Sequence, residues 1–287
     1  MKLIQISDLH FMPPGEALRG LDPQARLEAC IADINARQAD AEGCIITGDL
    51  ANAGQPLAYE NLRRCLRALR MPYFLVVGNH DSRERFRQAF PEVPQDENGF
   101  VQYAVDRGDV RLLMLDTVEE GAHWGAYCAA RAAWLDRQLT EADGRPAYLF
   151  MHHPPFDIGI PSTDNLRIRA PHDFADVVGR HRNVRHIFHG HVHRPVCGSW
   201  HGIPTSGLRS TNHQLQFDLE TVSPIPLCHE PPAYAMILLR PDQTTVHFHD
   251  FLDQSAIAET QASDFEADTT APDGMAANTT EPTPVCL

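Results

Sequence analysis

The sequence predicts an α/β fold that is built on mixed sheets. In the first half, short apolar runs alternate with helical patterns, which is the βαβα order of a fold with parallel strands. After residue 195 the apolar runs follow one another without helical patterns between them, and we expect these strands to form a meander. With 287 residues, of which 43% are hydrophobic, the chain is long enough for one large domain with a sizeable core.

The first half contains two helical patterns that are flanked by short buried strands. Leu27, Ile31 and Ile34 recur at helical spacing within residues 23–38, and leucines do the same within residues 56–69. The strands are the apolar runs KLIQIS (2–7), GCIITG (43–48) and PYFLVV (72–77).

The second half resembles the first only in part. We expect paired strands at 100–105 and 110–116, a helix at 129–139, a strand at 147–151, a helix at 173–179 and a strand at 184–190. The strands of the meander are PVCGSW (195–200), GIPTS (202–206), HQLQFDL (213–219), AYAMILL (233–239) and TTVHFH (244–249).

The last 35 residues differ in composition from the rest of the chain. They contain seven Asp and Glu residues and no Lys or Arg, and therefore account for half of the formal net charge of −14. We expect a folded domain over residues 1–252 and a disordered acidic tail over residues 253–287. Because the folded part is itself acidic, no nucleic acid polymer is expected as a partner.

From the pattern we expect neither an export signal nor a membrane-spanning segment. Its start, MKLIQISDLHF, lacks the apolar region and the cleavage site of a signal peptide, and no apolar run approaches the roughly 18 residues of a membrane-spanning helix. The seven cysteines are scattered without a CxxC pair, which favours reduced thiols over a disulfide framework. We expect a cytoplasmic protein, and the sequence leaves a homo-oligomer open.

Polar residues gather directly after the predicted strands, where the sites of α/β proteins assemble. Two pairs, Asp8 with His10 and His191 with His193, are spaced two apart, so in an extended chain each pair would project to one side. Oxygen and imidazole donors without a nearby thiolate suit divalent Mn, Fe, Co, Ni or Zn. The candidate ligands are Asp8, His10, Asp49, Asn79, His152, His191 and His193.

Seven ligands are too many for one tetrahedral ion. Two ions that share Asp49 would divide the others into Asp8, His10 and His193 on one ion, and Asn79, His152 and His191 on the second. Two ions about 3.5–4 Å apart hold the attacking and the leaving oxygens of a displacement at phosphorus, and they lower the pKa of bound water toward about 7. The pattern therefore indicates hydrolysis of a phosphoester by metal-bound hydroxide.

Five motifs in order, DLH (8–10), GD (48–49), GNHD (78–81), HHPP (152–155) and GHVH (190–193), resemble the signature of the calcineurin-like metallophosphoesterases over roughly residues 1–200. This resemblance implies a four-layer α-β-β-α sandwich of two mixed sheets and the division of ligands given above. Together with PPAY (231–234), the motifs look most similar to bacterial class III cyclic-nucleotide phosphodiesterases and the related glycerophosphodiesterases. The implied substrate is a small phosphodiester: a cyclic nucleotide of the cyclic AMP type first, and a glycerophosphodiester or another phosphodiester or phosphonate ester second.

Further roles follow from these motifs. Asn79 would be a neutral ligand, His80 would protonate the leaving oxygen as an imidazolium, and Asp81 would either orient the turn or cap a helix near Ser82. The family pattern His-x-Pro favours His152 over His153 as the ligand. In the glycerophosphodiesterase-like relatives a histidine at the place of His213 contacts the substrate phosphate, so His213 is expected to bind phosphate here.

Several readings stay open at this point. The metals could be Fe, Mn, Zn or Co, and loops 11–22 and 117–130 would line the substrate side without identifying the alcohol. His123, Trp124 and Tyr127 could form a lid, whereas His189 reads as a core residue. A nuclease of the same superfamily would need a basic groove, which the acidic folded part does not suggest. A non-catalytic scaffold on the same fold would be free to lose metal ligands, whereas every expected ligand is present here.

Overall fold

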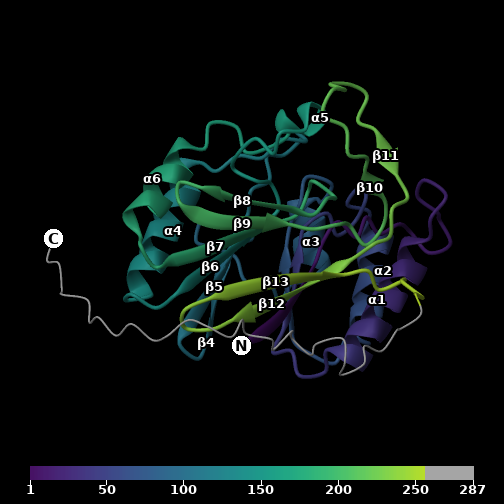
Figure 1. Ribbon diagram of the computed structural model, residues 1–287, viewed down its shortest axis with the longest axis horizontal. Helices are drawn as coiled ribbons and strands as arrows, with labels where there is room; N and C mark the ends of the chain where they lie inside the picture. Colours follow the sequence, from purple (N-terminus) through teal and green to yellow (C-terminus); the bar gives the residue numbers. More distant parts are fainter. Residues whose placement is uncertain (256–287) are drawn as a thin grey trace, which may run out of the picture. The chain divides into compact units, whose positions relative to one another are not determined.

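Two mixed sheets run through residues 1–255, which are the residues that the computed structural model describes (Figure 1). The first sheet has the strand order β13-β12-β1-β2-β3. Its three strands from the first half of the chain are parallel, whereas β12 pairs antiparallel with both β1 and β13. The strands are β1 (Lys2–Ile6), β2 (Cys44–Thr47), β3 (Tyr73–Val76), β12 (Tyr234–Leu239) and β13 (Thr244–His249).

The second sheet has the strand order β4-β5-β6-β7-β9-β8. Its four inner strands are parallel, and an antiparallel strand lies at each edge. The strands are β4 (Tyr103–Arg107), β5 (Val110–Met114), β6 (Ala147–Met151), β7 (Val184–His189), β8 (Val196–Trp200) and β9 (Ile203–Gly207). A separate two-stranded ribbon is formed by β10 (Gln214–Leu215) and β11 (Leu227–Cys228).

Helices lie along the chain between the parallel strands. The helices of the first half are α1 (Pro23–Arg37), α2 (Pro56–Leu66) and α3 (Arg83–Ala89), and those of the second half are α4 (Ala129–Glu141), α5 (Pro161–Asp164) and α6 (His172–Arg180). Figure 1 shows α1 and α2 on one side of the domain and α4 and α6 on the other. The helix α1 begins as its sequence suggests: the Asp22 carboxylate accepts hydrogen bonds from the backbone N–H groups of Gln24 and Ala25, and Pro23 follows the cap.

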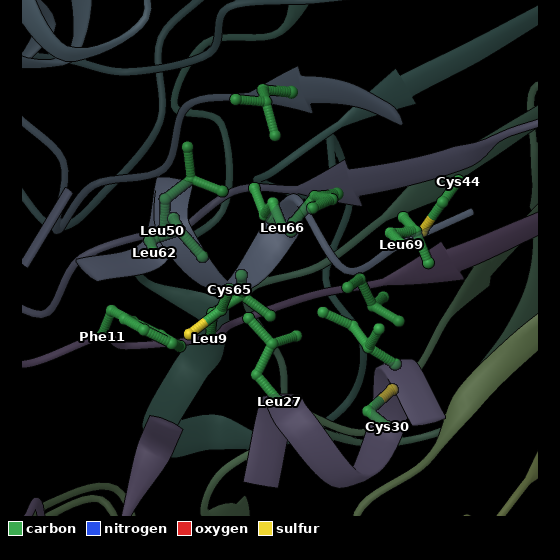
Figure 2. Packing of buried hydrophobic residues seen from close by; sticks show 14 of the residues in the cluster. Leu9, Phe11, Leu27, Cys30, Cys44, Leu50, Leu62, Cys65, Leu66 and Leu69 are labelled. Carbon is green, nitrogen blue, oxygen red and sulfur yellow. The ribbon is translucent and has the colours of Figure 1, made fainter. Parts of the chain in front are cut away.

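Three layers of apolar side chains separate the four layers of backbone. Alternate residues of one strand point to opposite faces, so Cys44 and Ile46 pack against the helices of the first half while Ile45 packs between the two sheets. Figure 2 shows part of the first layer, which includes Leu27 of α1 and Leu66 of α2 and in which Cys44 lies beside Leu69. A third layer joins the second sheet to α4 and α6. The expected α/β sandwich of two mixed sheets is confirmed.

The end of the chain differs from the expected meander. The hairpin of β8 and β9 extends the second sheet, whereas β12 and β13 return to the first sheet. The predicted strand at 213–219 is reduced to Gln214 and Leu215, and the side chains of Phe217 and Leu219 are 62% and 55% exposed. The alternating pattern was therefore misleading, because the pairing with the β11 segment ends at Gln216, whose N–H donates to the carbonyl oxygen of Pro226, and residues 217–219 belong to no strand. The sequence pattern did not predict bounds for the short helices α3 and α5.

The predicted tail, residues 253–287, lies outside the described residues apart from 253–255. Among residues 1–255, no helix is long and apolar enough to cross a membrane. The six cysteines in this part of the chain are free thiols.

A chain that ends after Leu252 is expected to keep the melting temperature and the turnover of the full chain. Phe251 still belongs to the apolar layer beneath α1 and α2, and the residues beyond it have the composition of a solvated segment. Calorimetry and steady-state kinetics on both chains check this. A clear drop in either quantity would show that residues 253–287 pack onto the domain or control access to it.

Candidate metal centre

The seven candidate ligands follow the carboxyl ends of parallel strands in both sheets. Asp8 and His10 come after β1, Asp49 after β2 and Asn79 after β3. His152 follows β6 in the second sheet, and the last two histidines, His191 and His193, follow β7. The structure brings residues that are more than 180 positions apart in the chain within reach of one another, as at His10 and His193.

Four of these residues form a first group of ligand atoms, all within 4.8 Å of one another: Asp8, His10, Asp49 and His193. The Nε2 atoms of His10 and His193 are 3.2 Å apart, and Nε2 of His193 is 3.3 Å from Oδ1 of Asp8. Oδ2 of Asp49 lies 3.6 Å from Nε2 of His10. The group is almost fully buried.

The second group is centred on Nε2 of His152. This atom lies 3.1 Å from Oδ1 of Asn79, 3.2 Å from Nδ1 of His191 and 3.3 Å from Oδ1 of Asp49. Asp49 therefore turns one carboxylate oxygen toward each group. This is the arrangement that a bridging ligand between two cations requires.

The backbone at these positions is strained. Five of the seven residues have φ between 46° and 70°, in the left-handed region that side chains other than glycine rarely occupy: Asp8, His10, Asp49, His191 and His193. Our expectation that an extended chain aligns each i, i+2 pair was therefore wrong. The left-handed turns still bring Asp8 and His10 to one group, but they send His191 and His193 to different groups. Strain of about 1–3 kcal/mol per residue is typical of functional sites.

Glycines in the motifs allow the strand ends to approach one another. A Cβ atom on Gly190 would lie 2.0 Å from Oγ of Ser7 and 2.6 Å from the carbonyl oxygen of Thr47. A Cβ atom on Gly78 would lie 2.3 Å from both the backbone nitrogen and Oδ1 of Asp49. Any larger residue would push the ligand loops apart.

Hydrogen bonds fix which nitrogen of two histidines can bind a cation. Nδ1 of His152 lies 2.8 Å from the carbonyl oxygen of Thr47, and Nδ1 of His193 lies 2.7 Å from that of His213. Because a carbonyl oxygen only accepts, each Nδ1 must carry the proton, and in a neutral imidazole Nε2 is then a free lone pair. Both lone pairs point at carboxylate oxygens, so each group needs a positive charge.

The pKa shifts show the same need for cations. Burial opposes ionisation of Asp8 and Asp49, but the facing His193 and His152 keep the pKa of both carboxyls below the ordinary value. Burial also disfavours the charged form of His152, yet Asp49 raises the pKa of this histidine to about 9. Burial lowers the pKa of His10 and His191 to about 3, which keeps both in the neutral form that binds metals. The donor set fits two divalent cations.

His80 is held at the edge of this centre by its backbone and its ring. Its N–H donates to Oδ1 of Asp49 at 2.9 Å, and its Nδ1 donates to the carbonyl oxygen of Asn52 at 2.6 Å. Nδ1 thus carries a proton, and Nε2 is left for the cavity that His80 lines. No sequence pattern pointed to Asn52, because only its backbone carbonyl contacts His80.

Asp81 orients the turn, which decides between the two roles considered for it. Its carboxylate accepts hydrogen bonds from the backbone N–H groups of Leu50, Ala51 and Gly78 and from the hydroxyl of Tyr59. The helix α3 is capped by Ser82 instead. Burial, with Asp49 nearby, raises the pKa of Asp81 to about 6.

The other histidines of the sequence analysis take different places. His213 lies beside the first group, with its ring centroid 4.8 Å from that of His193 and 5.0 Å from that of His10. His153 is buried near His152 and His191, and its Nδ1 is 2.8 Å from Oγ1 of Thr117. His189 is a core residue, as expected.

Only part of the expected lid faces the site. His123 lines the cavity, and its Nδ1 is 3.2 Å from Nδ2 of Asn79. Trp124 packs under the guanidinium of Arg169. Tyr127 is buried against Phe174 in the core of the second sheet, so its expected place in the lid was wrong.

A cavity of about 560 Å³ opens onto the centre. Part of its lining is polar and consists of residues of the two groups, together with His80 and His213. The apolar part comes from the segment after α5 and from the ribbon of β10 and β11 with its connecting loop, through Leu166, Leu215, Pro224, Ile225 and Leu227. The sequence did not predict this apolar lining, because its residues carry no motif and Leu215 was expected only as part of the strand at 213–219.

Comparisons with known proteins identify the family of the chain. The family model of the calcineurin-like phosphoesterases matches residues 1–195. A "Probable cyclic nucleotide phosphodiesterase" of Rhodopseudomonas palustris is 43% identical over 255 residues, which cover 88% of this chain and 93% of that protein. The "Glycerophosphodiester phosphodiesterase GpdQ" of Enterobacter lignolyticus is 31% identical over 80% of this chain and 81% of that protein. A crystal structure of a dimetal phosphatase from Danio rerio shares the fold, with a TM-score of 0.67, 16% identity and coverage of 88% and 96%.

Proposed function

Because the chain belongs to the calcineurin-like phosphoesterase family, we propose that it hydrolyses a small phosphodiester at a centre of two divalent cations. The observation that carries this proposal is the position of Asp49, which turns one oxygen toward His10 and the other toward His152. Asp8, His10 and His193 would hold one cation, Asn79, His152 and His191 would hold the other, and Asp49 would bridge them.

When bound, two such cations, of Fe, Mn, Zn or Co, supply Lewis acidity at the phosphoryl group and acidify water near it. The protein's own residues orient the reactants. His80 is fixed by Asn52 and Asp49, so its Nε2 can deliver a proton to the oxygen that leaves phosphorus. His213, on the side of the first group, is suited to bind a phosphate oxygen.

The cavity supports a cyclic nucleotide as the substrate. A nucleobase would bury apolar surface against Leu166, Leu215 and Ile225, whereas glycerol has little apolar surface to bury. The relative that is 43% identical is named as a probable cyclic nucleotide phosphodiesterase. A glycerophosphodiester is the second candidate, since the GpdQ relative is named for that activity.

A hydrolysis panel tests the proposal. The Mn-loaded protein would be assayed with cyclic AMP, cyclic GMP, glycerophosphodiesters and bis(p-nitrophenyl) phosphate. We expect hydrolysis of the p-nitrophenyl diester and the highest kcat/KM on a cyclic nucleotide. A higher value on a glycerophosphodiester would favour the second candidate. No hydrolysis of any diester by protein with its metals bound would point to a non-catalytic scaffold.

The change His213→Ala is expected to raise KM by about 10- to 100-fold and to leave kcat nearly unchanged. The histidine would bind phosphate in the ground state and in the transition state alike, and one hydrogen bond to a charged group contributes about 1.5–3 kcal/mol. Steady-state kinetics with metal analysis check this, and His247→Ala on the exposed face of β13 is the control. Loss of metal in His213→Ala would instead make His213 a ligand of the first group.

A further inference from the structure

Arg19 is the only lysine or arginine among the described residues that line the cavity. It lines this cavity together with His213 and Leu215, and its charge lies close enough to His213 to lower the pKa of that imidazole, in addition to the larger effect of burial. Within residues 1–255 its guanidinium makes neither a hydrogen bond nor an ion pair. A full positive charge therefore faces the substrate side without a carboxylate to neutralise it.

Two other arginines, Arg194 and Arg209, are paired with carboxylates and are therefore less available to bind an anion. Arg194 is paired with Glu230 at 3.1 Å, and Arg209 is paired with Asp250 at 3.0 Å and with Glu230 at 3.3 Å. These carboxylates offset both charges. Arg26 has no carboxylate partner either, but it donates to the carbonyl oxygen of Asn212 and does not line the cavity.

The backbone fixes Arg19 at the cavity. Leu18 and Leu21 exchange two backbone hydrogen bonds of 2.8 and 2.9 Å, and the two residues between them, Arg19 and Gly20, have φ of 52° and 79°. Positive φ at both central residues is the mark of a type I′ turn, in which asparagine or glycine is preferred at the first place. The cap at Asp22 anchors the loop at the start of α1. The tight turn leaves only the side chain of Arg19 free to reach a ligand.

We propose that Arg19 binds the oxygens of dianionic phosphate groups and gives the site a preference for phosphomonoester dianions, including the product of diester hydrolysis. The preference follows from Coulomb's law, since an unneutralised positive charge attracts a dianion about twice as strongly as a monoanion at the same distance. The planar guanidinium also matches two phosphate oxygens at once. This inference rests on the proposed function, because phosphate must bind at the adjoining metal centre for Arg19 to reach it.

Calorimetric binding tests the inference without turnover. The Mn-loaded full chain would be titrated at about pH 8 with inorganic phosphate, which is then mostly dianionic, and with dimethyl phosphate, a monoanionic diester. The variants are Arg19→Met, Arg19→Lys and, as a control for net charge, Arg185→Met on an exposed position of β7. Metal analysis on each variant confirms that the centre is intact.

We expect Arg19→Met to weaken phosphate binding by about 10- to 100-fold and dimethyl phosphate binding by a smaller factor. Arg19→Lys should keep part of the preference, and Arg185→Met should match the wild type. Equal weakening of both ligands in Arg19→Met, or no weakening relative to Arg185→Met, would overturn the inference. If no diester is hydrolysed but Arg19→Met weakens phosphate selectively, the proposed function fails while the role of Arg19 stands.

Discussion

Replacing Asp49 with alanine is expected to remove both cations and to reduce phosphodiester hydrolysis to the background rate. One oxygen of Asp49 faces Nε2 of His10 and the other faces Nε2 of His152, so one substitution takes a ligand from each group. It also leaves Asp8 as the one carboxylate among the remaining six ligands, so less negative charge is available to offset the repulsion between two cations. Metal analysis after dialysis, with turnover of bis(p-nitrophenyl) phosphate, measures both effects.

The control for this change is Asp136→Ala. Asp136 is a carboxylate on the surface that also pairs with an imidazole, His181, at 2.8 Å. Its loss should change neither the metal content nor the turnover. If Asp49→Ala kept the metal content of the wild type, or if both proteins held one tightly bound ion, the two-cation centre would be wrong.

Replacing His80 with alanine is expected to lower kcat on an alkyl phosphodiester by about 10²–10⁴ while both cations stay bound. His80 has no ligand atom in either group of donors, and its Nδ1 is taken up by the carbonyl oxygen of Asn52. Its remaining nitrogen faces the cavity, where a leaving alkoxide needs a proton. The loss should be much smaller for a p-nitrophenyl diester, because p-nitrophenolate leaves without protonation.

His123→Ala is the matched control for His80. The rings of His123 and His80 lie 5.6 Å apart, and both residues line the cavity. Removing His123 should leave the dependence on the leaving group as it is in the wild type. An equal fall in kcat for both leaving groups in His80→Ala would mean that His80 positions the phosphate, and the acid would then be sought at His153, at His213 or in metal-bound water.

The regular elements of the fold could be predicted where one face of the element is buried. Leu27, Ile31 and Ile34 mark the buried face of α1, and all three are fully or almost fully buried. The same logic failed at HQLQFDL, where alternating residues suggested a strand but Phe217 and Leu219 are exposed. Sequence periodicity indicates which side chains form the apolar face of an element. It does not indicate whether a partner strand is available to pair with that element.

The candidate site could be predicted as a set of residues but not as a geometry. The five motifs placed the ligands after parallel strands, and the structure brings them together. The left-handed backbone at Asp8, Asp49 and His193 was not foreseen, because no residue in the pattern required it. The hydrogen bonds that select the ligand nitrogens of His152 and His193 come from backbone carbonyls, which every residue has.

The walls of the cavity were the least predictable part. Leu215, Ile225 and Leu227 come from the β10–β11 ribbon and its connecting loop, and they line the same cavity as the candidate ligands, which are far from them in the sequence. Arg19 lies in a loop that was expected on the substrate side, but only the structure distinguishes it from the paired arginines. Substrate preference depends on these lining residues, so it can be inferred from the structure but not from the sequence motifs.

The most direct test of the account is the position of the metals. Crystals of the Mn-loaded protein would be measured at a wavelength where Mn scatters anomalously. Two anomalous peaks about 3.5–4 Å apart, one on each side of the Asp49 carboxylate, are the predicted result. A single peak, or two peaks that do not share Asp49, would contradict it.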